Sequence, residues 1–171
     1  MERNNVIKAK GQPLTLTGTE LKVGDKAPDF TLLDNNLTPV KLSETKGKPR
    51  LISVVTSLDT GTCSIQTRHF NKKLAELSDK AAIYTISDDL PFAQGRYAQE
   101  NKIDKVKILS DYRENSFGND YGLQIKELRL LARAVLVVDK DDRITHMQIV
   151  PEQTTEPNYT EAIEALQKVI D

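Results

Sequence analysis

Residues 51–77 read LISVVTSLDTGTCSIQTRHFNKKLAEL, an apolar run followed by a polar turn and then an amphipathic stretch. The first five residues are rich in β-branched side chains, which is typical of a buried strand. The amphipathic stretch places five residues on one helical face: Cys63, Thr67, Phe70, Leu74 and Leu77. The sequence therefore predicts a strand, a turn and a helix, with Cys63 at the start of the helix's core-facing side.

Cys63 is the single cysteine of the chain, and its position allows two interpretations. At a helix amino end, unpaired backbone N–H groups and the positive end of the helix dipole favour an ionised sulfur, which is the reactive form of cysteine. A free cysteine is also among the most buried residue types and behaves as a small hydrophobe. Position alone leaves both interpretations open.

The composition indicates one ordinary globular domain covering residues 1–171. Charged residues make up 29% of the chain and the net charge is −1, so no basic excess points to nucleic acid. We see neither an apolar run long enough for a membrane span nor the apolar stretch of a signal peptide. One cysteine cannot form an internal disulfide, which suits a reducing cytoplasm. With only two histidines beside it, a structural zinc site is not expected.

The rest of the chain alternates strand-like and helix-like segments. We expect a β-hairpin within residues 1–18, strands over 81–86, 131–138 and 143–150, and a helix from Pro91 to Tyr97. A last helix should begin near Asn158, where Glu161 follows at the spacing of a capping box. This order predicts an α/β fold with a mixed central sheet flanked by helices.

Several blocks, in order, resemble the peroxiredoxins, and in particular their thiol peroxidase branch. The first two are Ala27-Pro28-Asp29-Phe30 and Asp59-Thr60-Gly61-Thr62-Cys63. The next is residues 87–97, SDDLPFAQGRY, followed by residues 131–135, LARAV, and residues 154–157, TTEP. A lone Thr-x-x-Cys is a weak signal, whereas five blocks in the correct order are a specific one.

The resemblance implies a thioredoxin-like fold, a homodimer, and the reduction of hydroperoxides by a thiolate. By motif position the peroxidatic cysteine is Cys63, the assisting threonine is Thr60 and the assisting arginine is Arg133. A guanidinium favours a nearby anion, a hydroxyl can donate and accept hydrogen bonds, and fixed donors stabilise the charge that develops as the O–O bond breaks. No metal, flavin or nucleotide is required, and we see no glycine-rich phosphate loop.

Each assisting residue also has a structural interpretation. Thr60 could simply cap the following helix with its side chain, and Arg133, placed among apolar strand residues, could belong to a buried ion pair. His69 lies six positions beyond Cys63, so it should point away from the sulfur, and we expect it at the surface.

The sequence departs from the family pattern at two positions. The family usually has proline four residues before the assisting threonine, where this chain has Thr56. The branch usually has a second, resolving cysteine after the Arg-aromatic pair of the Pro-Phe-Ala-Gln block, where this chain has Ala98. The sequence therefore predicts a one-cysteine cycle completed by thioredoxin or another external thiol. The alternative is a redox sensor or thioredoxin-fold interaction protein with little turnover.

Overall fold

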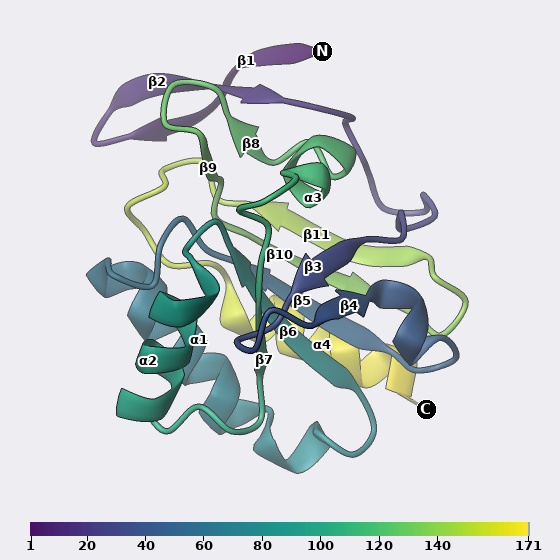
Figure 1. The fold of residues 1–171 in the computed structure, drawn as a ribbon. Coiled ribbons are helices and arrows are strands. Elements are labelled where there is room, and N and C mark those ends of the chain that lie inside the picture. Colours follow the sequence, from purple (N-terminus) through teal and green to yellow (C-terminus); the bar gives the residue numbers. More distant parts are fainter. Residues whose placement is uncertain (171) are drawn as a thin grey trace.

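A seven-stranded mixed sheet forms the centre of the protein, which we describe from a computed structural model covering residues 1–170. Its strand order is β11–β10–β5–β6–β7–β3–β4. In that order the strands span Ile144–Ile149, Ala134–Val138, Arg50–Val54, Ala82–Ser87, Lys107–Ser110, Thr31–Leu33 and Pro39–Lys41. The strands predicted near residues 51–55, 81–86 and 134–138 are thus the central ones, as Figure 1 shows.

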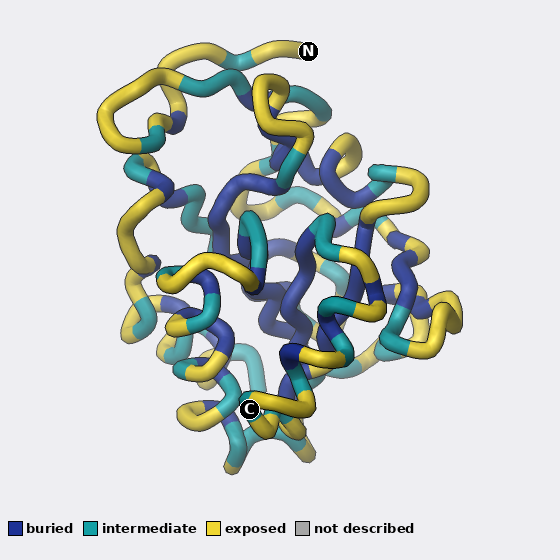
Figure 2. Tube along the Cα trace, turned by 60° about the vertical axis from the view of Figure 1, so that its left-hand side comes forward, coloured by how far each residue is buried: buried dark blue, intermediate teal, exposed yellow. Residues whose placement is uncertain are grey.

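The central strands are buried because both faces of the sheet are covered (Figure 2). β5, β6 and β7 run parallel, whereas β10 pairs antiparallel with both β5 and β11. A parallel pair needs a crossover connection, and the helices α1 (Gly61–Lys73) and α2 (Pro91–Glu100) supply the two crossovers. Burial on both faces explains why β5 and β10 read as apolar runs.

Three helices cover one face of this sheet. Phe70 and Leu74, from α1 and the residue after it, pack with Leu166 of α4 (Tyr159–Ile170) over inward-facing side chains of β5, β6 and β10. α2 packs on β7 at the same side, next to α1 in the lower left of Figure 1. Together these contacts place the amino end of α1 beside α2.

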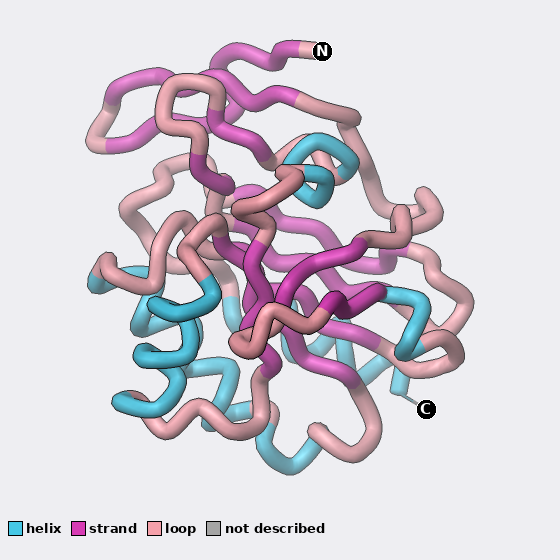
Figure 3. The backbone as a smooth tube through the Cα atoms, in the orientation of Figure 1, coloured by secondary structure: helices cyan, strands magenta, loops and turns pink. Residues whose placement is uncertain are grey.

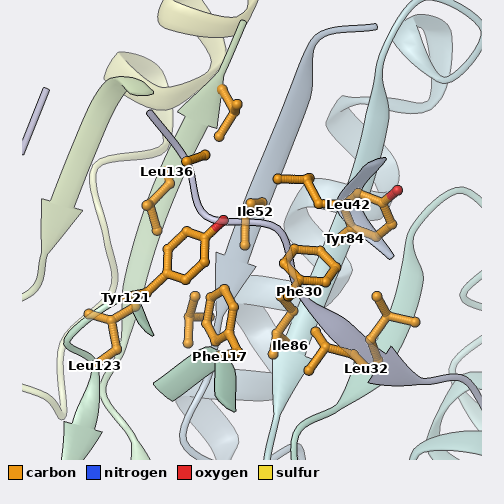
Figure 4. Close-up of a cluster of buried hydrophobic side chains, with 14 of the residues drawn as sticks. Phe30, Leu32, Leu42, Ile52, Tyr84, Ile86, Phe117, Tyr121, Leu123 and Leu136 are labelled. Atoms are coloured by element: carbon orange, nitrogen blue, oxygen red, sulfur yellow. The ribbon is translucent and has the colours of Figure 1, made fainter. Parts of the chain in front are cut away.

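An aromatic cluster fills the opposite face of the sheet (Figure 4). Phe30 contacts Phe117 and Tyr84 edge-on, and Phe117 stacks on Tyr121 with ring centroids 4.3 Å apart. The short helix α3 (Ser116–Asp120) carries Phe117, and the 3₁₀ helices η1 (Leu42–Thr45) and η2 (Ala75–Leu77) complete the fold. The α/β sandwich predicted from the sequence is confirmed.

The amino-terminal hairpin is joined to a second, smaller sheet. It consists of β1 (Glu2–Ala9) and β2 (Gln12–Thr17), and the sheet continues through β8 (Gln124–Ile125) and β9 (Leu130–Leu131). Ile7 and Leu16 of the hairpin are buried against Ile125 and Ala132. The hairpin lies at the top of Figure 3, apart from the helical layer. Within residues 1–170 no helix is long and apolar enough to cross a membrane.

Two predicted elements differ in detail. The segment 131–138 is not one strand, because residues 130–131 pair with β8 in the small sheet and residues 134–138 pair in the large one. The chain changes sheets at Ala132 and Arg133, which belong to neither strand. The capping box at Asn158 is only half formed. Its Oδ1 accepts from the Glu161 N–H at 3.1 Å, but its own N–H donates to Gln148 Oε1.

Candidate active site

Thr60 ends the loop after β5 and begins α1 through its backbone. It has extended backbone angles, and its carbonyl accepts the first helical hydrogen bond, from the Ser64 N–H at 3.0 Å. Its hydroxyl does not cap the helix, because it donates backwards to the Ser57 carbonyl at 2.9 Å. The alternative interpretation of Thr60, a simple side-chain cap, is therefore not what the structure shows. The oxygen of this exposed hydroxyl keeps its capacity to accept a hydrogen bond.

Cys63 lies in the first turn of α1 with its side chain fully enclosed. It packs in a cluster with Val55, Leu58, Tyr97 and Ile108, against which Ala98 is partly buried. Within residues 1–170, its sulfur has no hydrogen-bond partner. The first N–H groups of a helix have no intrahelical acceptor, so the peptide environment there favours negative charge.

Arg133 occupies the sheet-changing segment and is almost entirely buried. Its Nη1 donates to Gln66 Oε1 at 3.0 Å, and its Nε donates to the Gln153 carbonyl at 2.9 Å. Its backbone N–H also donates to Gln153 Oε1 at 2.5 Å. None of the ion pairs among the described residues includes Arg133. The structural alternative, a buried ion pair, is therefore not what the structure shows.

Gln66 connects Arg133 to the helix that carries Cys63. It stands three residues after Cys63, and side chains at this spacing are neighbours on a helix surface. Its Nε2 donates to Ser53 Oγ at 2.7 Å, so its Oε1 is turned towards the arginine. The guanidinium is thus bound by a side chain that starts one helical turn after Cys63.

Gln66 and Gln153 were missed by the sequence analysis. For Gln66, one signal was present in the sequence. Gln66 immediately precedes Thr67, so it is a polar residue next to the predicted buried side of the helix. Gln153 gave no local signal, since it lies in a loop twenty residues from the backbone it contacts. Both amides supply oxygen acceptors without charge, so they orient Arg133 without neutralising it.

No carboxylate among residues 1–170 pairs with the Arg133 guanidinium, and this determines the electrostatics of the site. A buried cation without a counterion is unfavourable, and an anion formed nearby would offset part of that cost. The Cys63 sulfur lies in the first turn of the helix whose Gln66 side chain binds this guanidinium. The arrangement is therefore suited to holding a thiolate.

The aromatic side chain of Tyr97 joins α2 to α1 beside the cysteine. Its hydroxyl lies 2.9 Å from Ser64 Oγ and donates to the Ser64 carbonyl at 3.1 Å. The next residue, Ala98, borders a cavity of about 350 Å³ that is also lined by Ile103 and Ile108. Position 98 thus belongs to the same packed cluster as Cys63.

His69 lies at the surface as expected, but it is only partly exposed. It is half-buried and stacks on Tyr159 of α4, with ring centroids 3.8 Å apart. Burial, and then the positive charge of Lys73, lower the pKa of His69 below its ordinary value. The stacking turns the ring towards α4, which agrees with the prediction that it points away from the sulfur.

Comparisons with known proteins agree with this geometry. Residues 22–163 match the sequence model of the family described as Redoxin. A thiol peroxidase of Halalkalibacterium halodurans is 54% identical over 93% of this chain and 95% of its own length. A thiol peroxidase of Bacillus subtilis is 52% identical over 96% of this chain and 98% of its own.

Solved structures of a peroxiredoxin-like protein and of a thiol peroxidase are also similar to this chain. A peroxiredoxin-like protein from Aquifex aeolicus superposes with a TM-score of 0.91 and 36% identity, over 98% of this chain and 97% of that one. A thiol peroxidase from Chromobacterium violaceum, at 20% identity, shares the fold with a TM-score of 0.85 over 95% of each chain.

Proposed function

This chain belongs to the Redoxin family and is a thiol-dependent peroxidase, and we propose that it reduces hydroperoxides by a one-cysteine cycle on Cys63. Hydrogen peroxide and organic hydroperoxides are the substrates that we assign. The observation that carries the site assignment is the buried guanidinium of Arg133, which forms no ion pair with any of residues 1–170 and donates to Gln66, a residue one helical turn after Cys63.

The first step oxidises the sulfur. The Cys63 thiolate attacks the terminal oxygen of the peroxide, an S–O bond forms and the O–O bond breaks. The products are a sulfenic acid on Cys63 and an alkoxide or hydroxide, which takes up a proton to leave as alcohol or water. Arg133 and the first N–H groups of α1 stabilise the negative charge, first on sulfur and then on oxygen. Thr60 accepts the hydrogen bond of the incoming hydroperoxide.

The second step needs a thiol from outside the chain, because Cys63 is the sole cysteine. An external thiol attacks the sulfenic acid, a mixed disulfide forms and water leaves; a second thiol then releases reduced Cys63 and a new disulfide. Thioredoxin or another cellular thiol is the reductant in this proposal. Because Cys63 is fully enclosed, a reductant of that size can reach it only when the first turn of α1 opens.

Assembly and location complete the proposal. We propose one domain over residues 1–171 with residues 1–18 as a hairpin extension, supported by the pairing of β2 with β8. A homodimer is supported by the large apolar side chains of Leu90, Phe92 and Tyr112, which remain exposed after β6 and β7. A lone cysteine suits the reducing cytoplasm. Sedimentation velocity at micromolar concentration measures the assembly state.

The deciding experiment is peroxide consumption with thioredoxin, glutathione and dithiothreitol compared side by side. Wild-type protein should turn over repeatedly with at least one of these thiols, and Cys63→Ser should not, because a hydroxyl is far less nucleophilic than a thiolate. Intact mass after one equivalent of peroxide should show one added oxygen, trappable by dimedone, or an intermolecular disulfide. A single turnover without recycling would instead support a redox sensor. Retained activity in Cys63→Ser would refute the mechanism.

A further inference from the structure

A carboxylate in the block of residues 87–97, to which no catalytic role was assigned, anchors the active-site loop. Asp89 follows β6, and its Oδ1 accepts a hydrogen bond from Ser57 Oγ at 2.7 Å. Its Oδ2 accepts from the Leu58 N–H at 2.8 Å and from Ser87 Oγ at 2.7 Å. Three donors thus converge on one side chain, and two of them belong to the loop that leads to Thr60.

The loop passes this restraint on to Thr60. The Ser57 carbonyl accepts both the N–H of Thr60, at 3.1 Å, and its hydroxyl, at 2.9 Å. The orientation of the Thr60 hydroxyl therefore depends on where Ser57 is held. Asp89 fixes Ser57, and Ser57 fixes Thr60.

The same carboxylate also fixes one wall of the cysteine cluster. Leu58, whose N–H it binds, is buried in contact with the cluster that encloses Cys63. Asp89 itself is fixed from the sheet, because Ser87 ends β6 and the Ser110 hydroxyl of β7 donates to the Asp89 carbonyl at 2.5 Å. The active-site loop is thus attached to the rigid ends of two central strands.

We propose that Asp89 is a positioning residue for the oxidation step, acting through Ser57 and Thr60 without contact with the peroxide. This proposal rests on the peroxidase function proposed above. Its carboxylate only accepts hydrogen bonds, so it holds the loop in the geometry that the attack requires, where small displacements are costly in rate.

The test compares three variants of two adjacent aspartates. Asp89→Ala leaves the Leu58 N–H and the Ser57 hydroxyl without their acceptor, and kcat/KM for peroxide should fall roughly tenfold to a hundredfold, the range that corresponds to a lost charge-assisted hydrogen bond. Asp89→Asn should keep most of the activity, because its oxygen can accept from Leu58 while its NH₂ donates to a rotated Ser57 hydroxyl. Asp88→Asn is the matched control, since no hydrogen bond from residues 1–170 reaches the buried Oδ1 of Asp88, and it should match the wild type.

If Asp89 acts by positioning, its loss should slow the oxidation of Cys63 by peroxide without slowing the reduction by the external thiol. In Asp89→Ala, kcat/KM for the thiol reductant should stay at the wild-type value while sulfenic acid formation slows, whereas general destabilisation would lower both. Ser57→Ala should reproduce the slow oxidation, and combining it with Asp89→Ala should add little further loss.

A readout independent of activity separates this proposal from the proposed function. Amide hydrogen exchange over residues 57–64 should accelerate in Asp89→Ala and not in Asp88→Asn, whether or not the protein consumes peroxide. Unchanged exchange and unchanged oxidation in Asp89→Ala would overturn the proposal. Equal losses in Asp89→Asn and Asp89→Ala would also overturn it, because the effect would then depend on charge. Peroxide consumption that survives Cys63→Ser would instead overturn the proposed function.

Discussion

Replacing Arg133 with methionine should separate activity from stability. The change removes a buried guanidinium that donates to Gln66 and to the Gln153 carbonyl and leaves a shorter, unbranched apolar side chain in its place. Loss of one preorganised donor to a developing oxyanion typically slows a reaction about 10²–10³-fold. We therefore expect kcat/KM for peroxide to fall by about that factor, measured by stopped-flow oxidation with dithiothreitol as reductant.

The effect of this change on stability should be small, because two contributions oppose each other. Each hydrogen bond from a charged donor stabilises by roughly 1.5–3 kcal/mol, and two are lost. Against this, removing a buried cation that pairs with no acidic group among the described residues eliminates a desolvation penalty of several kcal/mol. The free energy of unfolding of Arg133→Met should stay within about 2 kcal/mol of the wild type in urea titrations.

Arg50 provides the matched control. It is also buried, but its Nη2 pairs with Asp142 at 2.6 Å, and further bonds reach Thr45 and the Asp139 carbonyl, away from the active site. Breaking a buried pair by removing one partner costs about 3–5 kcal/mol, so Arg50→Met should be strongly destabilised. Its activity per folded molecule should be unchanged. If Arg133→Met keeps most of its activity, or is destabilised as much as Arg50→Met, the reasoning is wrong.

Three further changes test separate features. Thr60→Val should slow sulfenic acid formation at least about tenfold while Thr60→Ser does not, because only the hydroxyl is needed; stopped-flow rates compare them. Burial, followed by two neighbouring carboxylates, raises the pKa of Asp88 to about 7, so the folded state holds a proton there that the unfolded chain loses near pH 4. Stability from this group is therefore lost as the pH rises from about 4 to 7, and Asp88→Asn should raise Tm more at pH 8 than at pH 5. Ala98→Cys should form an internal disulfide with Cys63 after peroxide treatment, seen as a loss of two hydrogens by intact mass.

Local patterns predicted the scaffold because each element satisfies its own periodicity. The apolar runs became β5, β6 and β10, and the face from Cys63 to Leu74 became the buried side of α1 and its carboxyl end. The sheet change near Arg133 could not be predicted. Residues 131–138 are uniformly strand-like, and only pairing with distant partners decides where one strand ends and the next begins.

The network around the site depended on tertiary structure in the same way. Motif position indicated Cys63, Thr60 and Arg133, but not what orients them. The hydroxyl direction of Thr60 depends on a carbonyl three residues earlier, and Arg133 is oriented by an amide from α1 and a loop carbonyl. Such bonds join segments whose sequences are independent of one another, so no spacing rule reveals them.

One anchor holds α2 against the sheet and a second holds it against α1, and their difference indicates how Cys63 becomes accessible. Near its amino end, the fully buried Gln94 donates to Ser87 Oγ and to the Leu109 carbonyl, both at 2.9 Å. Near its carboxyl end, Tyr97 packs in the cluster around Cys63, and its hydroxyl makes partly buried bonds to Ser64 of α1. The second anchor is closer to solvent and belongs to the first turn of α1, so it should release first. A thiol at position 98 would reach Cys63 through the same release that admits an external thiol to the wild-type protein. Disulfide formation in Ala98→Cys therefore measures the opening on which the one-cysteine cycle depends.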